Sequence, residues 1–258
     1  MNKITSNGFS WNLIYDLRDM LQYDFVRHAF AAGTIVAVVA GVVGYFVVIR
    51  RLSFAAHALS HVGFAGAAGA VLIGLNPLLG LLAFTAGGGL SMAALGKRAA
   101  NRDVQIGTVL AFMLGLGVLF ISLYKGYATE AYSLLFGEIL GISAGDVVVT
   151  LIAGIITLLA VALLYRRLLF TSLDEDVAEA KGVSVFAMSV AFLLIVALAT
   201  SIAVQVVGVL LIFALMVTPA AIAERLSTRP MQGIVISVLV ALITTWFGLF
   251  ISFYQPYP

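Results

Sequence analysis

Long apolar stretches, separated by short polar or proline-containing breaks, run along almost the whole chain. About 20 consecutive apolar residues cross a bilayer as a helix, so the pattern predicts eight membrane spans. The expected spans are 25–49, 53–74, 78–97, 104–124, 145–170, 184–203, 206–226 and 231–254. The sixth and seventh are expected to be joined by a tight turn near Val204-Gln205.

Two further segments have helical patterns but are not expected to span. In residues 10–24, Ile14, Leu17 and Leu21 share one helical face, which predicts a short interfacial helix. Residues 131–142 are apolar but too short to cross, so they are expected to form a re-entrant or half-buried helix, enclosed by protein or lining a cavity. The predicted organisation is an extracytoplasmic N-terminal segment (1–24) followed by one transmembrane domain (25–258).

Composition supports an all-α integral membrane protein and excludes several other classes. The chain of 258 residues is 62% hydrophobic and 10% charged, with a mean hydropathy of +1.13. A soluble domain could not bury that much apolar surface. The absence of cysteine excludes disulfides and thiolate metal sites, and no basic run indicates nucleic acid binding. No GxxxxGK[ST] phosphate loop is present, so we expect no ATP hydrolysis by the chain itself.

Positive charge predicts the orientation of the spans. Ten of the fourteen Lys and Arg residues follow the first, third, fifth and seventh spans. They are Arg50, Arg51, Lys97, Arg98, Arg102, Arg166, Arg167, Lys181, Arg225 and Arg229. The positive-inside rule therefore predicts that these loops are cytoplasmic and that both termini are extracytoplasmic.

The second span contains His57 and His61, two of only three histidines in the chain. At four residues apart they share one helical face, about 9–15 Å deep when counted from Arg51. Ionisable residues at such depth usually face a bundle interior or a cavity. Ala65 and Ala68 continue the face and are expected to leave space beside the imidazoles.

The spacing of the two histidines is compatible with metal binding, with proton handling, and with simple packing. Histidines at i and i+4 can offer two nitrogens to one transition metal. The segment has no glutamate between them, which excludes a zinc protease motif. Either imidazole could instead hydrogen-bond a backbone carbonyl and join helices. Two nitrogens make an incomplete site, so a second copy of the chain or carboxylates would have to complete it, and Glu138 in the non-spanning segment is one candidate.

Two other features are a predicted short helix at 171–182 and a proline inside the seventh span. In residues 171–182, Ser172 and Glu175 fit a capping box and Gly182 fits a helix stop, which predicts a short cytoplasmic helix or otherwise a solvated connector. Pro219 lies inside the seventh span and removes a backbone hydrogen bond. We expect a kink there, either static or acting as a pivot for gating.

Four stretches, in order across nearly the whole chain, resemble one known family. They are FVVIRRLSFAAHALSHVGFAGAAGA (46–70), LLFGEILGIS (134–143), LDEDVAEAKGV (173–183) and VVGVLLIFALMVTPAAIAERL (206–226). The chain is similar in these to permease subunits of ATP-binding-cassette importers for manganese, zinc and iron, with the type II importer-like fold. The resemblance implies a bacterial cell-membrane protein that works as a homodimer around a pore.

The resemblance also implies partners and a coupling segment. ATP hydrolysis would come from a cytoplasmic ATPase dimer, and the ion from an extracytoplasmic metal-binding protein. The segment 173–183 would dock on the ATPase, with its packing and turn positions at Asp174, Val177, Ala178, Ala180 and Gly182.

One position departs from the family pattern. Family members commonly have an Asp four residues before the histidine of the second span, and here that position is His57. A nitrogen ligand in place of an oxygen moves the expected cargo from manganese towards zinc or ferrous iron. Two rival functions remain: a permease for a metal chelate or vitamin, and a proton-coupled secondary carrier with the histidines as proton relays.

Overall fold

The computed structural model describes residues 20–95, 102–124, 137 and 141–254. Within these residues the chain is helical, with short turns and no β-strand. The long helices are α2 (Asp24–Ile49), α3 (Ser53–Leu72), α4 (Pro77–Leu95), α5 (Arg102–Leu123), α7 (Ala144–Leu173), α9 (Val185–Leu226) and α10 (Pro230–Tyr254), and α8 (Glu175–Ala180) is short. Seven of them are long and apolar enough to cross a membrane. The predicted all-α membrane fold is confirmed.

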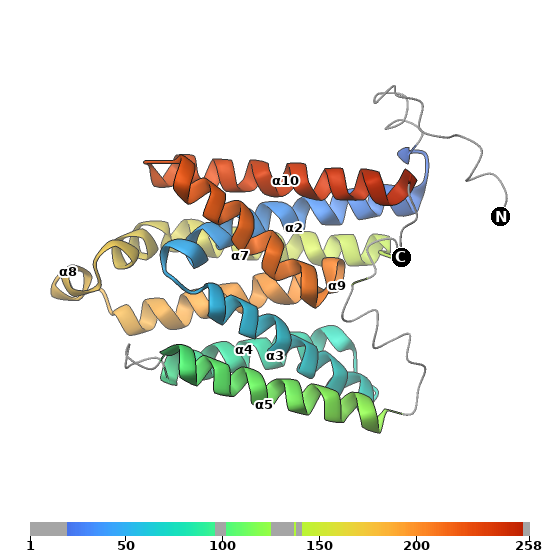
Figure 1. Cartoon of the computed structure of the whole chain (residues 1–258), viewed down its shortest axis with the longest axis horizontal. Helices are drawn as coiled ribbons and strands as arrows, with labels where there is room; N and C mark the ends of the chain where they lie inside the picture. The colour runs from blue at the N-terminus through green and yellow to red at the C-terminus, as the bar shows by residue number, and fades with distance from the viewer. Residues whose placement is uncertain (1–19, 96–101, 125–136, 138–140, 255–258) are drawn as a thin grey trace.

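The expected sixth and seventh spans form one continuous element, α9, with a break in the middle. Helical geometry continues through Val204 and Gln205, so the predicted turn there is wrong. The break lies at Gly208, whose φ of 81° and ψ of 166° only glycine adopts readily. The first arm (185–207) and the second arm (209–226) run in different directions (Figure 1). Helix α9 therefore contributes two membrane crossings, which makes about eight in all.

The connections after α2, α7 and α9 lie at one end of the bundle. Figure 1 shows the α2–α3 turn, α8 and the α9–α10 turn at the left of the view, and the start of α2 and the end of α10 at the right. These three connections carry Arg50, Arg51, Lys181 and Arg229. The fold therefore brings these arginine and lysine residues to one end of the bundle, because alternate connections lie at the same end.

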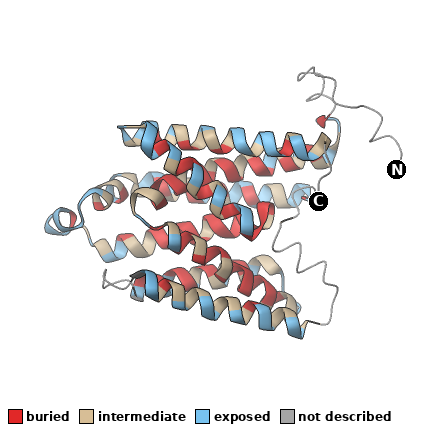
Figure 2. Cartoon of the chain, in the orientation of Figure 1, coloured by how far each residue is buried: buried red, intermediate tan, exposed pale blue. Residues whose placement is uncertain are grey.

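Helices α2, α3 and α9 form the centre of the bundle, whereas α5 and α10 present much of their surface outward (Figure 2). Small residues allow the close approach of the central helices. A Cβ placed on Gly44 of α2 would lie 2.0 Å from the carbonyl oxygen of Met216 in the second arm of α9. The fully buried hydroxyls of Thr85 in α4 and Ser201 in α9 hydrogen-bond at 2.8 Å.

Two predicted segments fall largely outside the described residues. Of the expected interfacial helix 10–24, only residues 20–24 are described. Of the non-spanning segment 131–142, residues 137, 141 and 142 are described, and Glu138 is not. Gly137 has φ +75°, and a Cβ there would lie 2.6 Å from the backbone nitrogen of Gly208. Gly137 thus meets α9 at its break.

Candidate functional site

Helix α3 holds the two histidines on one face in its first half. The ring centroids of His57 and His61 are 4.7 Å apart, with an interplanar angle of 83°. Both side chains are half-buried, so neither is fully exposed on the outer surface of the bundle. The spacing in the sequence therefore does bring the two imidazoles together edge to face.

Each imidazole has one buried nitrogen without a partner. The Nδ1 atoms of His57 and His61 have no hydrogen-bond partner among the described residues. The neighbouring hydroxyl of Ser60 donates instead to the carbonyl oxygen of Ala56. A buried polar atom without a partner costs about 1–3 kcal/mol. Neither Nδ1 atom therefore joins two helices by a hydrogen bond within the described residues, as the packing alternative would require.

Phe213 in the second arm of α9 completes the surroundings of the pair. Its ring lies 4.8 Å from the His57 ring, at an interplanar angle of 65°. The contact connects the histidine helix to the arm that begins at Gly208. Nothing in the sequence singled out this phenylalanine, because a contact between distant parts of the chain leaves no local pattern.

The opposite side of α3 is packed against α4 through its glycines. A Cβ on Gly63 would lie 2.9 Å from the side chains of Leu81 and Thr85. The expectation of open space along the alanine face is wrong for Ala65. Ala65 is fully buried, and its Cα lies 3.3 Å from the Cβ position of Gly117 in α5.

The histidine pair is an incomplete ligand set. Among the described residues no group of three or more His, Cys, Asp or Glu side chains could hold a metal ion. Glu138, the carboxylate expected as a further ligand, lies outside the described residues. Two imidazoles can bind a metal only weakly unless other ligands join them, and weak coordination suits an ion that must also leave.

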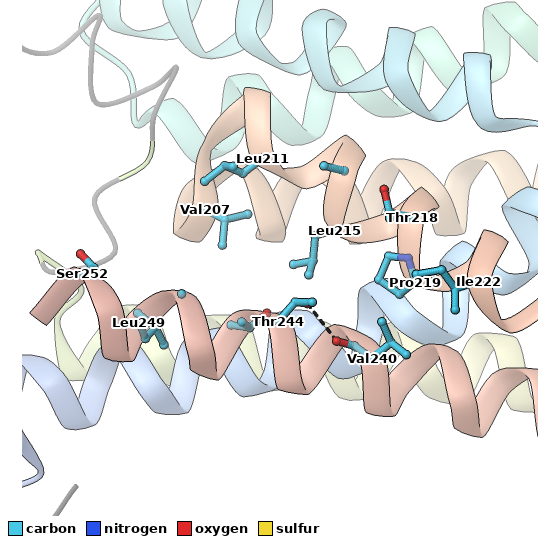
Figure 3. A pocket seen from close by; sticks show the side chains of 13 residues that line it. Val207, Leu211, Leu215, Thr218, Pro219, Ile222, Val240, Thr244, Leu249 and Ser252 are labelled. Carbon is cyan, nitrogen blue, oxygen red and sulfur yellow. Dashed lines mark hydrogen bonds between the residues drawn. The ribbon is translucent and has the colours of Figure 1, made fainter. Parts of the chain in front are cut away.

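A large cavity lies away from the histidines, between the second arm of α9 and α10. It has a volume of about 510 Å³, and Figure 3 shows that Leu211, Leu215, Pro219 and Thr244 contribute to its walls. The described residues of its lining include no His, Asp or Glu. Pro219 is buried against this cavity, and the backbone around it stays helical; the non-helical residue of α9 is Gly208.

The predicted short helix after α7 exists as α8, but its N-cap is not the predicted one. Asp174 caps it by accepting a hydrogen bond from the Val177 amide at 3.0 Å. Ser172, the predicted cap, belongs to the last turn of α7 and donates to the carbonyl oxygen of Leu168. Gly182 ends the helix with φ +79°, as predicted.

The exposed surface of α8 is both acidic and apolar. Glu175, Asp176 and Glu179 are exposed, as are Val177 and Ala180. Ala178, expected in the packing surface for a partner, is instead fully buried, since α8 packs on α7 and α9 of its own chain. The surface that remains for a partner excludes Ala178.

Comparisons with known proteins agree with this architecture. The manganese transport system membrane protein MntC of Listeria monocytogenes is 32% identical over 238 residues, which cover 92% of this chain and 85% of that protein. The manganese import system permease protein ScaB of Streptococcus gordonii is 29% identical, with the same two coverages of 92% and 85%. In the solved structure of PsaBC from Streptococcus pneumoniae in complex with Fab, one chain matches with a TM-score of 0.82 and 29% identity, covering 93% of this chain and 87% of that chain.

The family assignment covers nearly the entire sequence. Residues 22–258 match the model of a single family, and this range includes all the helices described above. The chain is therefore a multi-pass membrane protein, and it belongs to the ABC 3 transport family.

Proposed function

We propose that the chain is the permease subunit of an ATP-driven importer of a divalent transition metal ion. The observation that carries the proposal is the His57–His61 pair, with two unpartnered Nδ1 atoms at membrane depth. A metal ion passing the pair gives these buried nitrogens the partner that the described residues lack. The names of the relatives, which are manganese transport and import proteins, support metal as the cargo class.

The pore is proposed to lie between two copies of the chain. A single copy offers two imidazoles and no third ligand among its described residues. A second copy related by a twofold axis would add its own pair and double the ligand set. Because Phe213 lies beside His57, the second arm of α9 is proposed to line the same passage.

The identity of the ion depends on two arguments that favour different metals. The relatives are named for manganese, which prefers oxygen ligands. Two imidazoles suit zinc or ferrous iron better. The test must therefore measure zinc, manganese and iron together.

Two further partners follow from this proposal. A cytoplasmic ATPase dimer supplies hydrolysis, because the chain has no phosphate-binding loop. It docks on the exposed part of α8, whose carboxylates favour a basic groove. An extracytoplasmic metal-binding protein delivers the ion to the opposite end. This orientation, with the arginine-rich connections in the cytoplasm of a bacterial cell and both termini outside, follows from the positive-inside rule.

The proposal is tested by metal content in a transport-deficient bacterial host. Cells express the complete importer with wild-type chain, His57→Ala, His61→Ala or His57→Asp, and mass spectrometry measures the three metals. His28→Ala is the matched control, because His28 is the third histidine and lies at the start of α2. Protein level in the membrane is measured for each variant.

We expect one metal to accumulate with wild type and His28→Ala and to fall to background with either alanine variant of the pair. His57→Asp is expected to move the preference towards manganese. Normal uptake by both alanine variants would show that the histidines only pack. Uptake that persists with a hydrolysis-deficient ATPase, and collapses with the proton gradient, would instead support a secondary carrier.

A further inference from the structure

Arg50 lies where α7 and α9, the helices next to α8, meet the turn that leads into α3, the helix of the two histidines. It is the C-cap residue of α2, and α3 begins at Ser53. Its side chain crosses to the end of α7 and the beginning of α9, the two helices on which α8 packs. Arg50 thus joins the end of α2 to two further helices.

The guanidinium of Arg50 binds α7 and α9 through both of its terminal nitrogens. Nη1 donates to Thr171 Oγ1 at 2.8 Å, and more distantly to the Leu168 carbonyl oxygen and Ser172 Oγ, both at 3.4 Å. Nη2 donates to Ser189 Oγ in α9 at 3.4 Å. The hydroxyl protons of Thr171 and Ser172 are directed to backbone carbonyls of α7, so both oxygens are free to accept. The planar fork of arginine can make these contacts together, which lysine cannot.

An aromatic cluster packs beside Arg50 at the contact of α2, α7 and α9. The Arg50 Cζ atom lies 5.3 Å from the centroid of the Phe192 ring in α9. Phe46 of α2 packs edge-to-face on Phe192 and on Tyr165 of α7, with centroid distances of 6.3 and 5.9 Å. The ends of α2 and α7 and the start of α9 are therefore held together as one packed unit.

The connection from Arg50 to α3 is short and well defined. The Arg51 amide donates to the Val48 carbonyl at 2.9 Å, and the Leu52 amide to the Val47 carbonyl at 2.8 Å. These two bonds form a Schellman turn, and Leu52 is buried. His57 lies about 6 Å along the helix from Ser53. A shift of Arg50 therefore moves the start of α3, and with it the histidine pair.

A polar cavity of about 300 Å³ separates the α2–α3 turn from the start of α8. Its walls include Arg50, Arg51, Thr171, Asp174 and Glu175. The cavity lies between the turn and α8, and Arg50 bonds the turn to α7 and α9, the helices on which α8 packs. The contacts thus connect α8 to α3 through a side chain rather than through direct packing of α8 on α3.

We propose that Arg50 is the positioning residue that transmits displacement of α8 to α3 and so to His57 and His61. The inference rests on the proposed function, in which the ATPase moves α8. The alternative is that Arg50 is only a charged anchor at the membrane interface. An anchor needs the positive charge but not the fork, so Arg50→Lys separates the two roles.

The test uses the complete importer reconstituted in lipid vesicles, with metal uptake and ATP hydrolysis measured on the same samples. The variants are Arg50→Gln and Arg50→Lys. Arg51→Gln and Arg51→Lys are matched controls, because Arg51 neighbours Arg50 in the same turn and cavity but is exposed. Both variants at position 50 should lower the metal moved per ATP hydrolysed about tenfold, the range expected for loss of a coupling contact. Both controls should leave the ratio within about twofold of wild type.

A second readout follows the helices themselves. The chain contains no cysteine, so Phe54→Cys in α3 and Val177→Cys in α8 each introduce the one thiol of this subunit, and its labelling is read on the separated subunit. Both residues are exposed. In the otherwise wild-type importer, ATP should change the labelling rate at both positions. With Arg50→Gln added, the change at Val177→Cys should persist and the change at Phe54→Cys should disappear.

The outcomes separate this inference from the proposed function. Unchanged coupling in Arg50→Lys, or a nucleotide-dependent change at Phe54→Cys that survives Arg50→Gln, would overturn the role of Arg50 while leaving the importer intact. A parallel loss of uptake and hydrolysis in Arg50→Gln, with folding intact, would also overturn it. Absence of ATP-dependent uptake by the wild-type complex would overturn the proposed function, and this inference with it.

Discussion

Gly66 of α3 and Gly80 of α4 cross so closely that each would clash with the other if it carried a side chain. A Cβ on Gly66 would lie 2.2 Å from the Gly80 carbonyl oxygen, and a Cβ on Gly80 would lie 2.1 Å from the Gly66 carbonyl oxygen. The contact is backbone against backbone, so no side-chain rotation can relieve it. It determines how far α3, the helix of the histidine pair, stands from its neighbour.

Replacing Gly66 by alanine should therefore separate α3 from α4. Overpacking of a close contact costs about 1–3 kcal/mol, and the shift of α3 would also displace His57 and His61. We expect a lower thermal unfolding midpoint in detergent and reduced metal uptake in cells. Gly87→Ala is the matched control in α4, since a Cβ there meets nothing within 4 Å. A Gly66→Ala protein as stable as Gly87→Ala would contradict the backbone contact.

Gly137 should be equally intolerant of a side chain, because its contact is with the backbone at the break of α9. Its Cβ position lies 2.6 Å from the Gly208 nitrogen and 2.7 Å from the Val207 carbonyl carbon. Gly137→Ala would push against the break in α9 and change the angle between its two arms. We expect loss of uptake and a lower unfolding midpoint, measured on purified protein.

Gly74 provides the control for backbone conformation alone. It has the same φ of +75° as Gly137, but a Cβ there meets nothing within 4 Å. Gly74→Ala incurs only the cost of a left-handed residue, about 1–2 kcal/mol. If Gly137→Ala were no more harmful than Gly74→Ala, contact with the α9 break would not be its constraint.

The sequence predicted most helices well because their ends carry strong local signals. Pro77 and Pro230 begin α4 and α10, and Arg50 follows the end of α2. The break in α9 was misplaced because Val204 and Gln205 look no different from a turn between two apolar runs. The signal that could have found it is Gly208, the glycine in that region able to adopt the observed φ and ψ.

The candidate site was predictable only in part. Spacing on one helix correctly placed His57 and His61 side by side, because helical periodicity is a local property. The contact of Phe213 with His57, and the contacts of Arg50 with α7 and α9, join residues far apart in the chain. Such pairs depend on how helices pack, and apolar spans of similar composition do not specify their neighbours.

The contact between Phe213 and His57 leads to a prediction about uptake kinetics. The two rings are in edge contact, and we expect this contact to limit rotation of the imidazole. An aromatic pair contributes about 0.5–1.5 kcal/mol, so Phe213→Ala should raise the KM for the metal about fivefold by freeing His57. Phe112→Ala is the control, since Phe112 is 63% exposed on α5. Equal KM values for the two variants would show that Phe213 does not position the histidine.

Arg51 occupies a backbone position that normally favours glycine. Its φ is 55°, and its Schellman turn at the end of α2 has the same pattern as the turn at the end of α8, where Gly182 has φ +79°. A residue with a Cβ in this conformation costs about 1–2 kcal/mol, so Arg51→Gly should raise the unfolding midpoint and Gly182→Ala should lower it. Arg51→Ala keeps the Cβ and removes the charge, so it should bring no gain. If alanine and glycine at position 51 stabilise equally, the effect comes from the charge. If only glycine does, the chain retains a strained residue directly between the Arg50 junction and the histidine helix.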